Sequence, residues 1–153
     1  MDRRGILAML AAPLALTATW RRGAAAEPKL GGTHRLVLHV DQNDAAVMTM
    51  ALGNAANAAA HYAREGESIA LELVAYGPGL HMLRADTSPV KERLAAIHAS
   101  LPHMTFSACN NTKAAMEKAE GKEIVLLPEA RLVPAGIVRL MELQEQGWSY
   151  VRP

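Results

Sequence analysis

The amino-acid sequence predicts an α/β protein with a three-layer α/β/α architecture and a mostly parallel five-stranded sheet. Three observations lead to this fold class. Short apolar runs alternate with segments of helical periodicity, the connections between them are short, and one apolar run is almost unbroken. An unbroken run is typical of a strand that is covered on both faces. Strands and helices that alternate in this way produce a parallel sheet with helices on both sides.

The first strand and helix are predicted between residues 35 and 66. The apolar run 35–40 indicates a strand, and Asp44 in the polar segment after it is a favourable N-cap residue. Apolar side chains then recur at steps of three and four up to Tyr62, which is the helical period. Gly66 is expected to end this helix, because glycine is common just beyond a helix C-terminus.

The middle of the chain keeps the same order of elements. Residues 69–76 form the nearly unbroken apolar run and indicate a buried strand. The Gly-Pro-Gly sequence at 77–79 predicts a loop. The helix after it is expected to begin with Ser88 as N-cap and Pro89 at the first helical position. Residues 104–108 are predicted as the third strand.

The last third of the sequence predicts two more helices and two more strands. A helix is expected at 110–119, a fourth strand at 124–127, and a further helix after Pro134. A short strand at 148–151 completes the sheet. The elements therefore predict one α/β domain over residues 27–153.

Composition and charge limit the class of protein. The chain has 153 residues, of which 50% are hydrophobic and 20% charged, which suits one globular domain with a substantial core. The formal net charge is +1, but the first 26 residues hold four arginines and a single acidic residue. The remainder is therefore mildly acidic and lacks the basic surface that nucleic-acid binding requires.

The first 26 residues are predicted to be an export signal. A basic Arg3-Arg4 pair precedes an apolar run at 6–16, and three alanines at 24–26 offer a cleavage site. The apolar run is too short to span a bilayer, which takes about 20 apolar residues. The arginine pair also resembles a twin-arginine signal, so the Sec and the twin-arginine (Tat) export routes both stay open. The mature domain is expected in the periplasm, free of the membrane after signal removal.

Cys109 is the only cysteine of the chain. In an oxidising compartment it is buried and inert, joined to another chain, or free and reactive. It follows the predicted third strand and precedes a predicted helix. Unpaired N–H groups and the positive end of the dipole at a helix start favour the thiolate, which is the nucleophilic form. Cys109 is therefore the candidate catalytic residue.

Other polar residues are expected near the same edge of the sheet, because ligands bind beyond the carboxyl ends of parallel strands. His39 and Asp41 follow the first strand, His81 follows the Gly-Pro-Gly loop, and Asn110 follows Cys109. Glycines let a backbone come close to a ligand, so the loop is expected to shape the cleft. Each histidine taken singly is also compatible with an ordinary loop residue. The predicted binding residues are His39, Asp41, Gly77, Gly79, His81 and Asn110.

A metal site competes with this interpretation. Cys109, His39 and His81 together would supply sulfur and nitrogen ligands that suit zinc or copper. The sequence has no CxxC or HxxxH spacing to support such a site, so neither a metal nor a cofactor is predicted. The other histidines fall at the amino ends of strands or within helices and are expected to be surface residues; they are His34, His61, His98 and His103.

Three separated segments resemble a known family. They are VAYGPGL at 74–80, FSACNNT at 106–112 and RLMELQEQGW at 139–148. In this order they are similar to the DsrE/DsrF-like (YchN-like) sulfur-relay family, in its small single-domain branch, and the similarity covers the chain from about Arg35 onward. The resemblance implies a three-layer α/β/α fold, oligomers that are often trimers or hexamers, and a persulfide on Cys109. The predicted export signal departs from the relay members, so their cytoplasmic partners are not carried over.

Two functions follow as hypotheses. The first is a sulfur carrier or sulfurtransferase-like protein that takes sulfane sulfur from a donor onto Cys109. The second is a non-catalytic oligomeric module that binds a small anion or a partner in the same cleft. A disulfide between two copies through Cys109 is a third use of the thiol.

Overall fold

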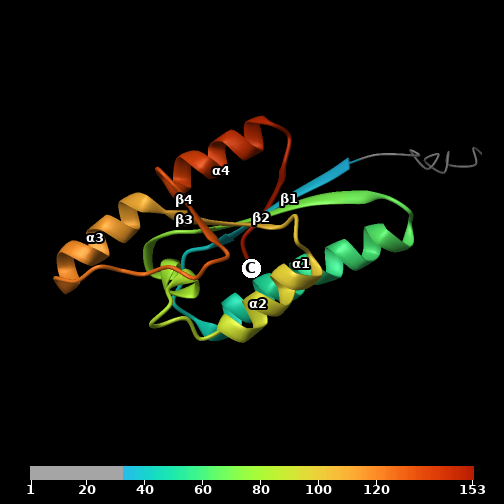
Figure 1. Cartoon of the computed structure of the whole chain (residues 1–153). Coiled ribbons are helices and arrows are strands. Elements are labelled where there is room, and N and C mark those ends of the chain that lie inside the picture. Colours follow the sequence, from blue (N-terminus) through green and yellow to red (C-terminus); the bar gives the residue numbers. More distant parts are fainter. Residues whose placement is uncertain (1–32) are drawn as a thin grey trace, which may run out of the picture.

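The computed structural model describes residues 33–153, and within this range the chain forms one five-stranded sheet (Figure 1). The predicted export signal, with its Arg3-Arg4 pair, lies outside the described residues. The strands follow the order β4-β3-β2-β1-β5, and every pair is parallel. The predicted three-layer α/β/α fold is confirmed, with a sheet that is wholly rather than mostly parallel. The strands are β1 (Thr33–Val40), β2 (Ser68–Ala75), β3 (Thr105–Cys109), β4 (Ala130–Val133) and β5 (Ser149–Val151).

Helices cover the two faces of the sheet unequally. Figure 1 shows α1 and α2 beneath the sheet and α4 above it, while α3 projects from the end of β3. The helices are α1 (Ala45–Arg64), the 3-10 helix η1 (Gly77–Leu83), α2 (Lys91–Ser100), α3 (Asn110–Glu120) and α4 (Gly136–Glu145). Within residues 33–153 no helix combines the length and apolar character needed to cross a bilayer.

The main hydrophobic core lies between the sheet and the α1–α2 layer. It joins strand residues such as Leu38 and Phe106 to Leu52 of α1 and Leu94 of α2, all of them fully buried. The core on the opposite face is much smaller and consists of Val37, Val74, Leu140 and Leu143, with Tyr76 and Trp148 packed against it. This second layer therefore depends on a single helix, α4.

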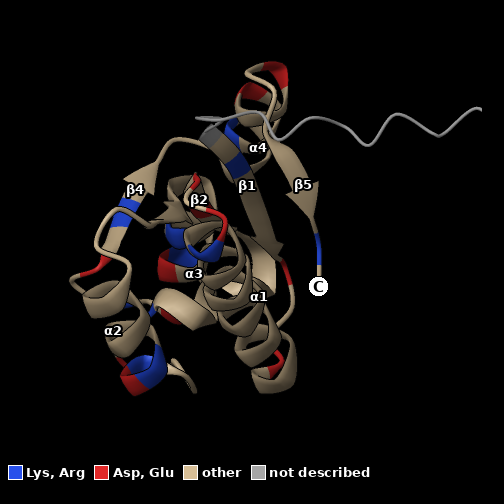
Figure 2. Ribbon diagram, turned by 90° about the vertical axis from the view of Figure 1, so that its right-hand side faces the viewer, with Lys and Arg blue, Asp and Glu red and all other residues tan. Residues whose placement is uncertain are grey.

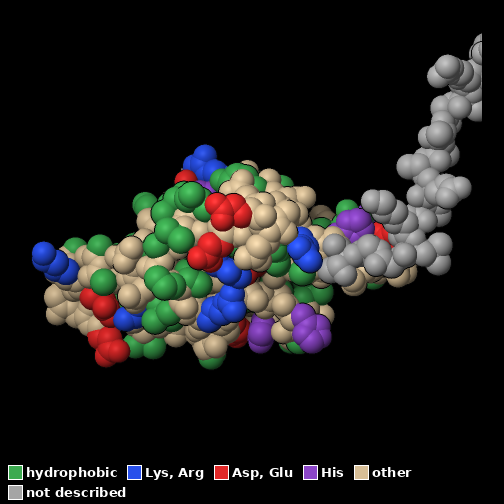
Figure 3. All heavy atoms as spheres, turned by 90° about the horizontal axis from the view of Figure 1, so that it is seen from above, with side chains coloured by type: hydrophobic (Ala, Val, Ile, Leu, Met, Phe, Trp, Pro, Cys, Tyr) green, Lys and Arg blue, Asp and Glu red, His purple; other side chains and the backbone are tan. Residues whose placement is uncertain are grey.

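The outward side of α4 carries apolar residues. Ile137, Val138 and Met141 are each about half exposed. Figure 3, which looks onto the α4 side, shows apolar side chains set among charged ones. The strands contain few charged residues (Figure 2); Arg35, Glu72 and Arg131 are the Lys, Arg, Asp and Glu residues of the five described strands.

Local sequence signals place most helix starts. The Asp44 carboxylate accepts hydrogen bonds from the N–H groups of Ala46 and Val47 at 2.7 and 3.3 Å, which confirms it as the N-cap of α1. The prediction for α2 was wrong by two residues, because Val90 is its N-cap. The Ser88 hydroxyl instead donates to the carbonyl oxygen of Met82 at 2.6 Å and ties the preceding turn.

The predicted fourth strand is wrong. Residues 124–127 pair antiparallel with the segment after η1, where Ala85 N–H donates to the Val125 carbonyl at 2.8 Å and Leu127 N–H donates to the Leu83 carbonyl at 2.9 Å. The strand beside β3 is β4, which begins at Ala130. As an edge strand it has an exposed side and needs no continuous apolar run, so its sequence lacks the signal that marks β2.

The Gly-Pro-Gly segment forms the start of η1 rather than an open loop. Gly77 has a φ of +52°, a conformation that favours glycine. A Cβ atom on Gly79 would lie 2.2 Å from the carbonyl oxygen of Val40, so only glycine fits against the end of β1. This close contact fixes the turn that follows β2.

We expect Gly79→Ala to destabilise the domain by about 1–3 kcal/mol or more, because the added carbon must push backbone away. Urea unfolding followed by circular dichroism measures this change. Gly53→Ala is the matched control: its Cβ would meet Arg93 at an ordinary 3.6 Å, inside α1. Alanine there should leave stability unchanged or raise it by up to about 1 kcal/mol. Equal stability of Gly79→Ala and the wild type would contradict the prediction.

Candidate functional site

Cys109 is the last residue of β3 and the N-cap of α3. Its Sγ accepts a hydrogen bond from the backbone N–H of Thr112 at 3.5 Å. The residue is 5% exposed, so the thiol lies just below the surface. Cys109 therefore lies where the sequence predicts, at the carboxyl end of the third strand and the start of a helix.

A second helix begins at the same point. Gly136 is the first residue of α4, and a Cβ atom on it would lie 3.3 Å from Cβ of Cys109 and 2.9 Å from Cδ1 of Tyr76. Glycine thus lets the start of α4 rest directly on these two side chains. The connection into α4 is also joined to α3, since Asn111 N–H donates to the carbonyl oxygen of Pro134 at 3.3 Å. The starts of α3 and α4 therefore meet at the sulfur.

This arrangement shifts the ionisation of the thiol. Burial by itself raises the pKa of Cys109. The hydroxyl of Thr112 and the backbone N–H groups of Gly136, Thr112 and Asn111 lower it by hydrogen bonding to the sulfur. The pKa of the thiol lies below its ordinary value because these donors outweigh the burial.

Thr112 connects the thiol to the turn after β2. Its Oγ1 accepts a hydrogen bond from the N–H of Gly77 at 3.0 Å. That bond occupies a lone pair of the oxygen and leaves the hydroxyl proton available for the sulfur. Gly77, a predicted binding residue, therefore acts on the site through Thr112, and Gly79 acts by packing the turn against β1.

His39 and Asp41 lie at the end of β1, as the sequence predicts. His39 is 4% exposed and its Nδ1 hydrogen-bonds the hydroxyl of Tyr150 at 2.7 Å. Its Nε2 is buried without a hydrogen-bond partner among the described residues and lies 4.0 Å from a carboxylate oxygen of Asp41. Arg152 in turn pairs with Asp41 at 3.0 Å. This His39 cluster surrounds one imidazole with polar groups from the ends of β1 and β5.

Tyr76 joins the His39 cluster to the thiol. Its ring stacks on His39 with centroids 4.6 Å apart and also contacts Gly136, which rests on Cys109. Burial, followed by the charge of Asp41, raises the pKa of Tyr76, so its hydroxyl stays protonated. Tyr76 was not predicted as a site residue, because it ends an apolar run that indicates a buried strand. Its place between two predicted site residues depends on the pairing of β1, β2 and β3.

The imidazole of His39 is neutral at neutral pH. Burial lowers its pKa, Asp41 partly opposes this, and Arg152 lowers it further. A neutral imidazole beside Tyr76 supplies no positive charge to the thiol. The stabilisation of a Cys109 thiolate therefore comes from peptide and hydroxyl dipoles rather than from an imidazolium ion.

His81 does not join this site. It belongs to η1, whose buried residues pack into the core on the α1–α2 side, and its Nδ1 hydrogen-bonds Thr87 at 2.8 Å. Among the described residues the side-chain hydrogen bond of His81 is to Thr87 rather than to Cys109 or the His39 cluster. Asn110 is exposed as the first residue of α3. Across residues 33–153, no three His, Cys, Asp or Glu side chains gather as metal ligands.

The remaining histidines are less uniform than predicted. His34 hydrogen-bonds Glu67 at 2.7 Å and stacks on Tyr62, while His61 and His103 are exposed. His98 is half-buried, and its Nδ1 has no hydrogen-bond partner in the described part of the chain. His34 is a surface residue as expected, since its side chain is 36% exposed, whereas His98 packs against Phe106 and buries a ring nitrogen.

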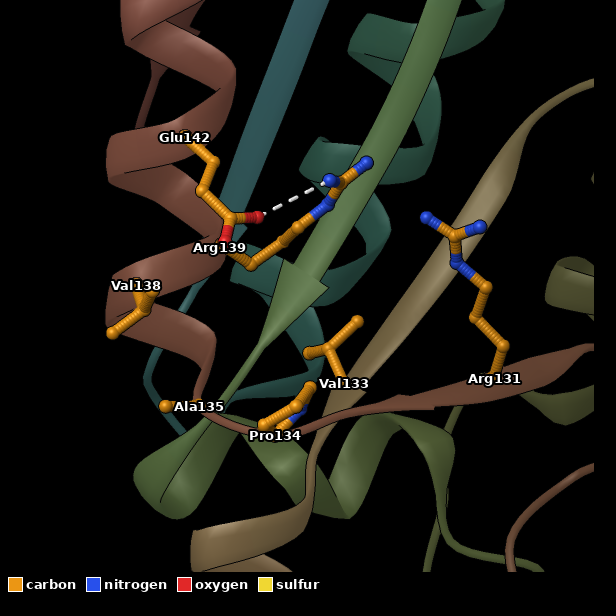
Figure 4. A pocket seen from close by; sticks show the side chains of 7 residues that line it. All are labelled: Arg131, Val133, Pro134, Ala135, Val138, Arg139 and Glu142. Atoms are coloured by element: carbon orange, nitrogen blue, oxygen red, sulfur yellow. Dashed lines mark hydrogen bonds and ion pairs between the residues drawn. The ribbon is translucent and has the colours of Figure 1, made fainter.

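Two hollows are lined by neighbours of Cys109, although the cysteine itself lines neither of them. A pocket of about 190 Å³ between β4 and α4 is lined by the chain just before Gly136, together with Arg131 and Arg139 (Figure 4). Figure 4 shows both guanidinium groups turned into the space between β4 and α4. A more open groove of about 470 Å³ runs between η1 and α3 and is lined in part by Asn111 and Thr112. The segments that donate to the thiol form walls of both hollows.

The fold and this site define the class of protein: a three-layer α/β domain with a cysteine at the carboxyl edge of its parallel sheet. No known family model matches the sequence, and no curated protein matches it. Among solved structures the chain is similar to MTH1491, a protein of unknown function from Methanobacterium thermoautotrophicum. The two are 30% identical with a TM-score of 0.66, over 78% of this chain and 99% of that one. The chain belongs to the same family as MTH1491.

We expect alkylation of Cys109 to reach half its maximal rate at a pH below the ordinary thiol value of about 8.5. Thr112→Val should raise that midpoint and slow alkylation at neutral pH roughly threefold, because the sulfur loses its hydroxyl donor. Reaction with iodoacetamide across a pH series measures both. Thr112→Ser keeps the hydroxyl and serves as the control. A midpoint shared by all three proteins would show that the hydroxyl does not act on the thiol.

Proposed function

We propose that the protein is a sulfur carrier, or a sulfurtransferase-like protein, that holds sulfane sulfur as a persulfide on Cys109. The observation that supports this most directly is the meeting of two helix starts at one sulfur atom. Backbone donors from α3 and α4 and a hydroxyl donor act on the thiol together. Groups arranged in this way favour an anionic sulfur without a dedicated base.

The chemistry of loading balances without a further reactant. The Cys109 thiolate attacks the outer sulfur of a sulfane donor, such as thiosulfate or a polysulfide. A new S–S bond forms on Cys109, and the old S–S bond breaks with its electron pair on the leaving group, which is sulfite from thiosulfate. Unloading repeats the step with an acceptor thiolate, which attacks the outer sulfur and regenerates the Cys109 thiolate. Helix N-termini stabilise the bound anion before and after each transfer.

The neighbouring side chains have separate roles in this proposal. Tyr76 borders the start of α4 beside the thiol, and its protonated hydroxyl is suited to donate a hydrogen bond. His39 lies behind the Tyr76 ring and orients it by stacking. His39 therefore supports the site through Tyr76, and His81 has no part in it.

A non-catalytic binding module is the second candidate. The 5% exposure of Cys109 favours it, because a nearly buried thiol meets a dissolved donor slowly. In this function the same cleft recognises a small anion or a partner without a bond to sulfur. The same limited exposure argues against a disulfide between two copies, which needs two sulfur atoms about 2 Å apart.

The location and assembly implied by the sequence belong to the same proposal. The carrier would act in the periplasm after cleavage near Ala26, as a homo-oligomer, with a sulfane donor or other small anion as its partner. No membrane contact is proposed after signal removal.

We expect the mature protein to gain the mass of one or more sulfur atoms after exposure to thiosulfate or polysulfide, and dithiothreitol to remove it. Intact-protein mass spectrometry measures the change. Cys109→Ser should gain none, because it lacks the thiol. It is a suitable control because serine is nearly the same size as cysteine. Unmodified wild type, or equal gain by Cys109→Ser, would rule out the carrier and leave the binding module.

We expect the mature protein to be a trimer or hexamer in solution. Met141→Glu should lower the assembled fraction at least roughly tenfold if the exposed side of α4 is the interface, because it places a charge in an apolar contact. Light scattering after size-exclusion chromatography measures the mass. Met50→Glu, at another exposed apolar position in α1, is the control. A monomeric wild type would contradict the expected assembly.

A further inference from the structure

We propose that Glu72 and Arg139 are positioning residues for Cys109: their ion pair, which is buried at Glu72, holds α4 where Gly136 rests against the Cys109 side chain. The proposal rests on the proposed function in one respect, because a tuned thiol matters only if Cys109 reacts. Its test reads the ionisation of the thiol and needs no sulfur donor. Failure of sulfur loading would therefore leave this inference standing. Failure of the Glu72–Arg139 test would likewise leave the proposed sulfur carrier standing.

The ion pair is bidentate, and its carboxylate is buried while its guanidinium is partly exposed. Glu72 of β2 is 2% exposed, and its two carboxylate oxygens accept hydrogen bonds from Nε and Nη2 of Arg139 at 2.8 and 2.7 Å. The hydroxyl of Ser107 donates to the same carboxylate at 2.6 Å. Arg131 of β4 approaches it more loosely, at 3.5 Å. A bidentate pair of this kind fixes orientation as well as distance.

The ion pair lies close to the sulfur site along both α4 and β3. Arg139 follows Gly136 by three residues, which is about one turn of helix, so both lie on the same side of α4. Ser107 precedes Cys109 by two residues, so both point from the same face of β3. The ion pair therefore joins α4 to the sheet directly beside the place where Gly136 rests on Cys109.

Apart from the hydrogen bond between Asn111 and Pro134 in the connection before it, few other contacts hold the start of α4. The buried apolar residues of the helix, Leu140 and Leu143, lie after the first turn and pack on β1 and β2. Its N-cap residue, Ala135, makes no side-chain capping bond. Glu142 touches Arg139 only at 3.4 Å and is half exposed. Within the first turn, the contacts of Gly136 and the Glu72–Arg139 pair therefore set where the helix begins.

Positioning and direct charge predict opposite signs, which makes the idea testable. Removing the negative charge of Glu72 favours a nearby thiolate by Coulomb's law alone, so a direct effect lowers the thiol pKa. If the pair acts by holding α4, the same substitution frees the helix start, weakens the Gly136 contact and raises the thiol pKa. Glu72→Gln keeps the volume of the side chain and separates the two mechanisms.

The experiment measures iodoacetamide alkylation of Cys109 across pH in the mature protein. We expect Glu72→Gln to raise the midpoint and slow alkylation at neutral pH at least roughly threefold. Arg139→Lys keeps the charge but loses the bidentate contact, and we expect the same direction of change. The Gly136 amide should also exchange its hydrogen faster in both variants.

Two control variants complete the design. Glu142→Gln removes the other carboxylate that touches Arg139, and its midpoint should stay at the wild-type value. Leu143→Val loosens the far half of α4 and should lower stability without moving the midpoint. A lower or unchanged midpoint in Glu72→Gln would overturn the proposal. If Glu72→Gln does not fold, an unchanged midpoint and unchanged Gly136 exchange in Arg139→Lys would overturn it equally.

Discussion

One sulfur atom at the start of two helices constrains the rest of this structure. The Sγ of Cys109 accepts a hydrogen bond from the first turn of α3, which follows it in sequence. The first residue of α4, Gly136, lies 27 positions later and rests against the same side chain. For both to reach it, β4 must lie beside β3, and the turn into α4 must pass directly over Tyr76. The absence of a side chain on Gly136 makes that passage possible.

The site is built on the thinner side of the molecule. The larger core, between the sheet and the α1–α2 layer, buries most of the apolar side chains. The opposite layer has a four-residue core and replaces missing apolar contact by polar ones. Helix α3 is also held by polar contacts, and none of its residues is buried. The Gly77–Thr112 hydrogen bond joins it to η1, and Glu120 pairs with Arg84, the buried residue that follows η1. Polar contacts hold both helices whose starts reach the thiol.

Burial and dipoles oppose one another at Cys109, and their balance decides its chemistry. A thiol this deep would be inert in an apolar setting, because desolvation disfavours the thiolate. Here hydrogen-bond donors outweigh the effect of burial and lower the thiol pKa, so a protected thiol keeps anionic character. Burial limits access to the thiol, which is only 5% exposed. Either the sulfur donor is small, or the walls of the two nearby hollows must move to admit it. A carrier that must keep its cargo from dissolved reductants has use for that combination.

Much of the fold was predictable from the sequence, because periodicity and capping are local. The Asp44 cap, the buried run of β2 and the helix after Cys109 follow from residues within a few positions of one another. The position of Cys109 at a helix start was predictable for the same reason, because the residues that begin α3 follow it directly in the sequence. β4 escaped prediction because an edge strand needs no apolar run, and the more apolar segment 124–127 paired elsewhere. Tertiary structure alone decided which strand ends meet, and so which side chains share the site. It paired His81 with Thr87, and it brought Tyr76, Thr112 and Gly136 to the thiol. Contacts across strands and between helix starts leave no periodic pattern in the sequence, so these three residues could not be predicted.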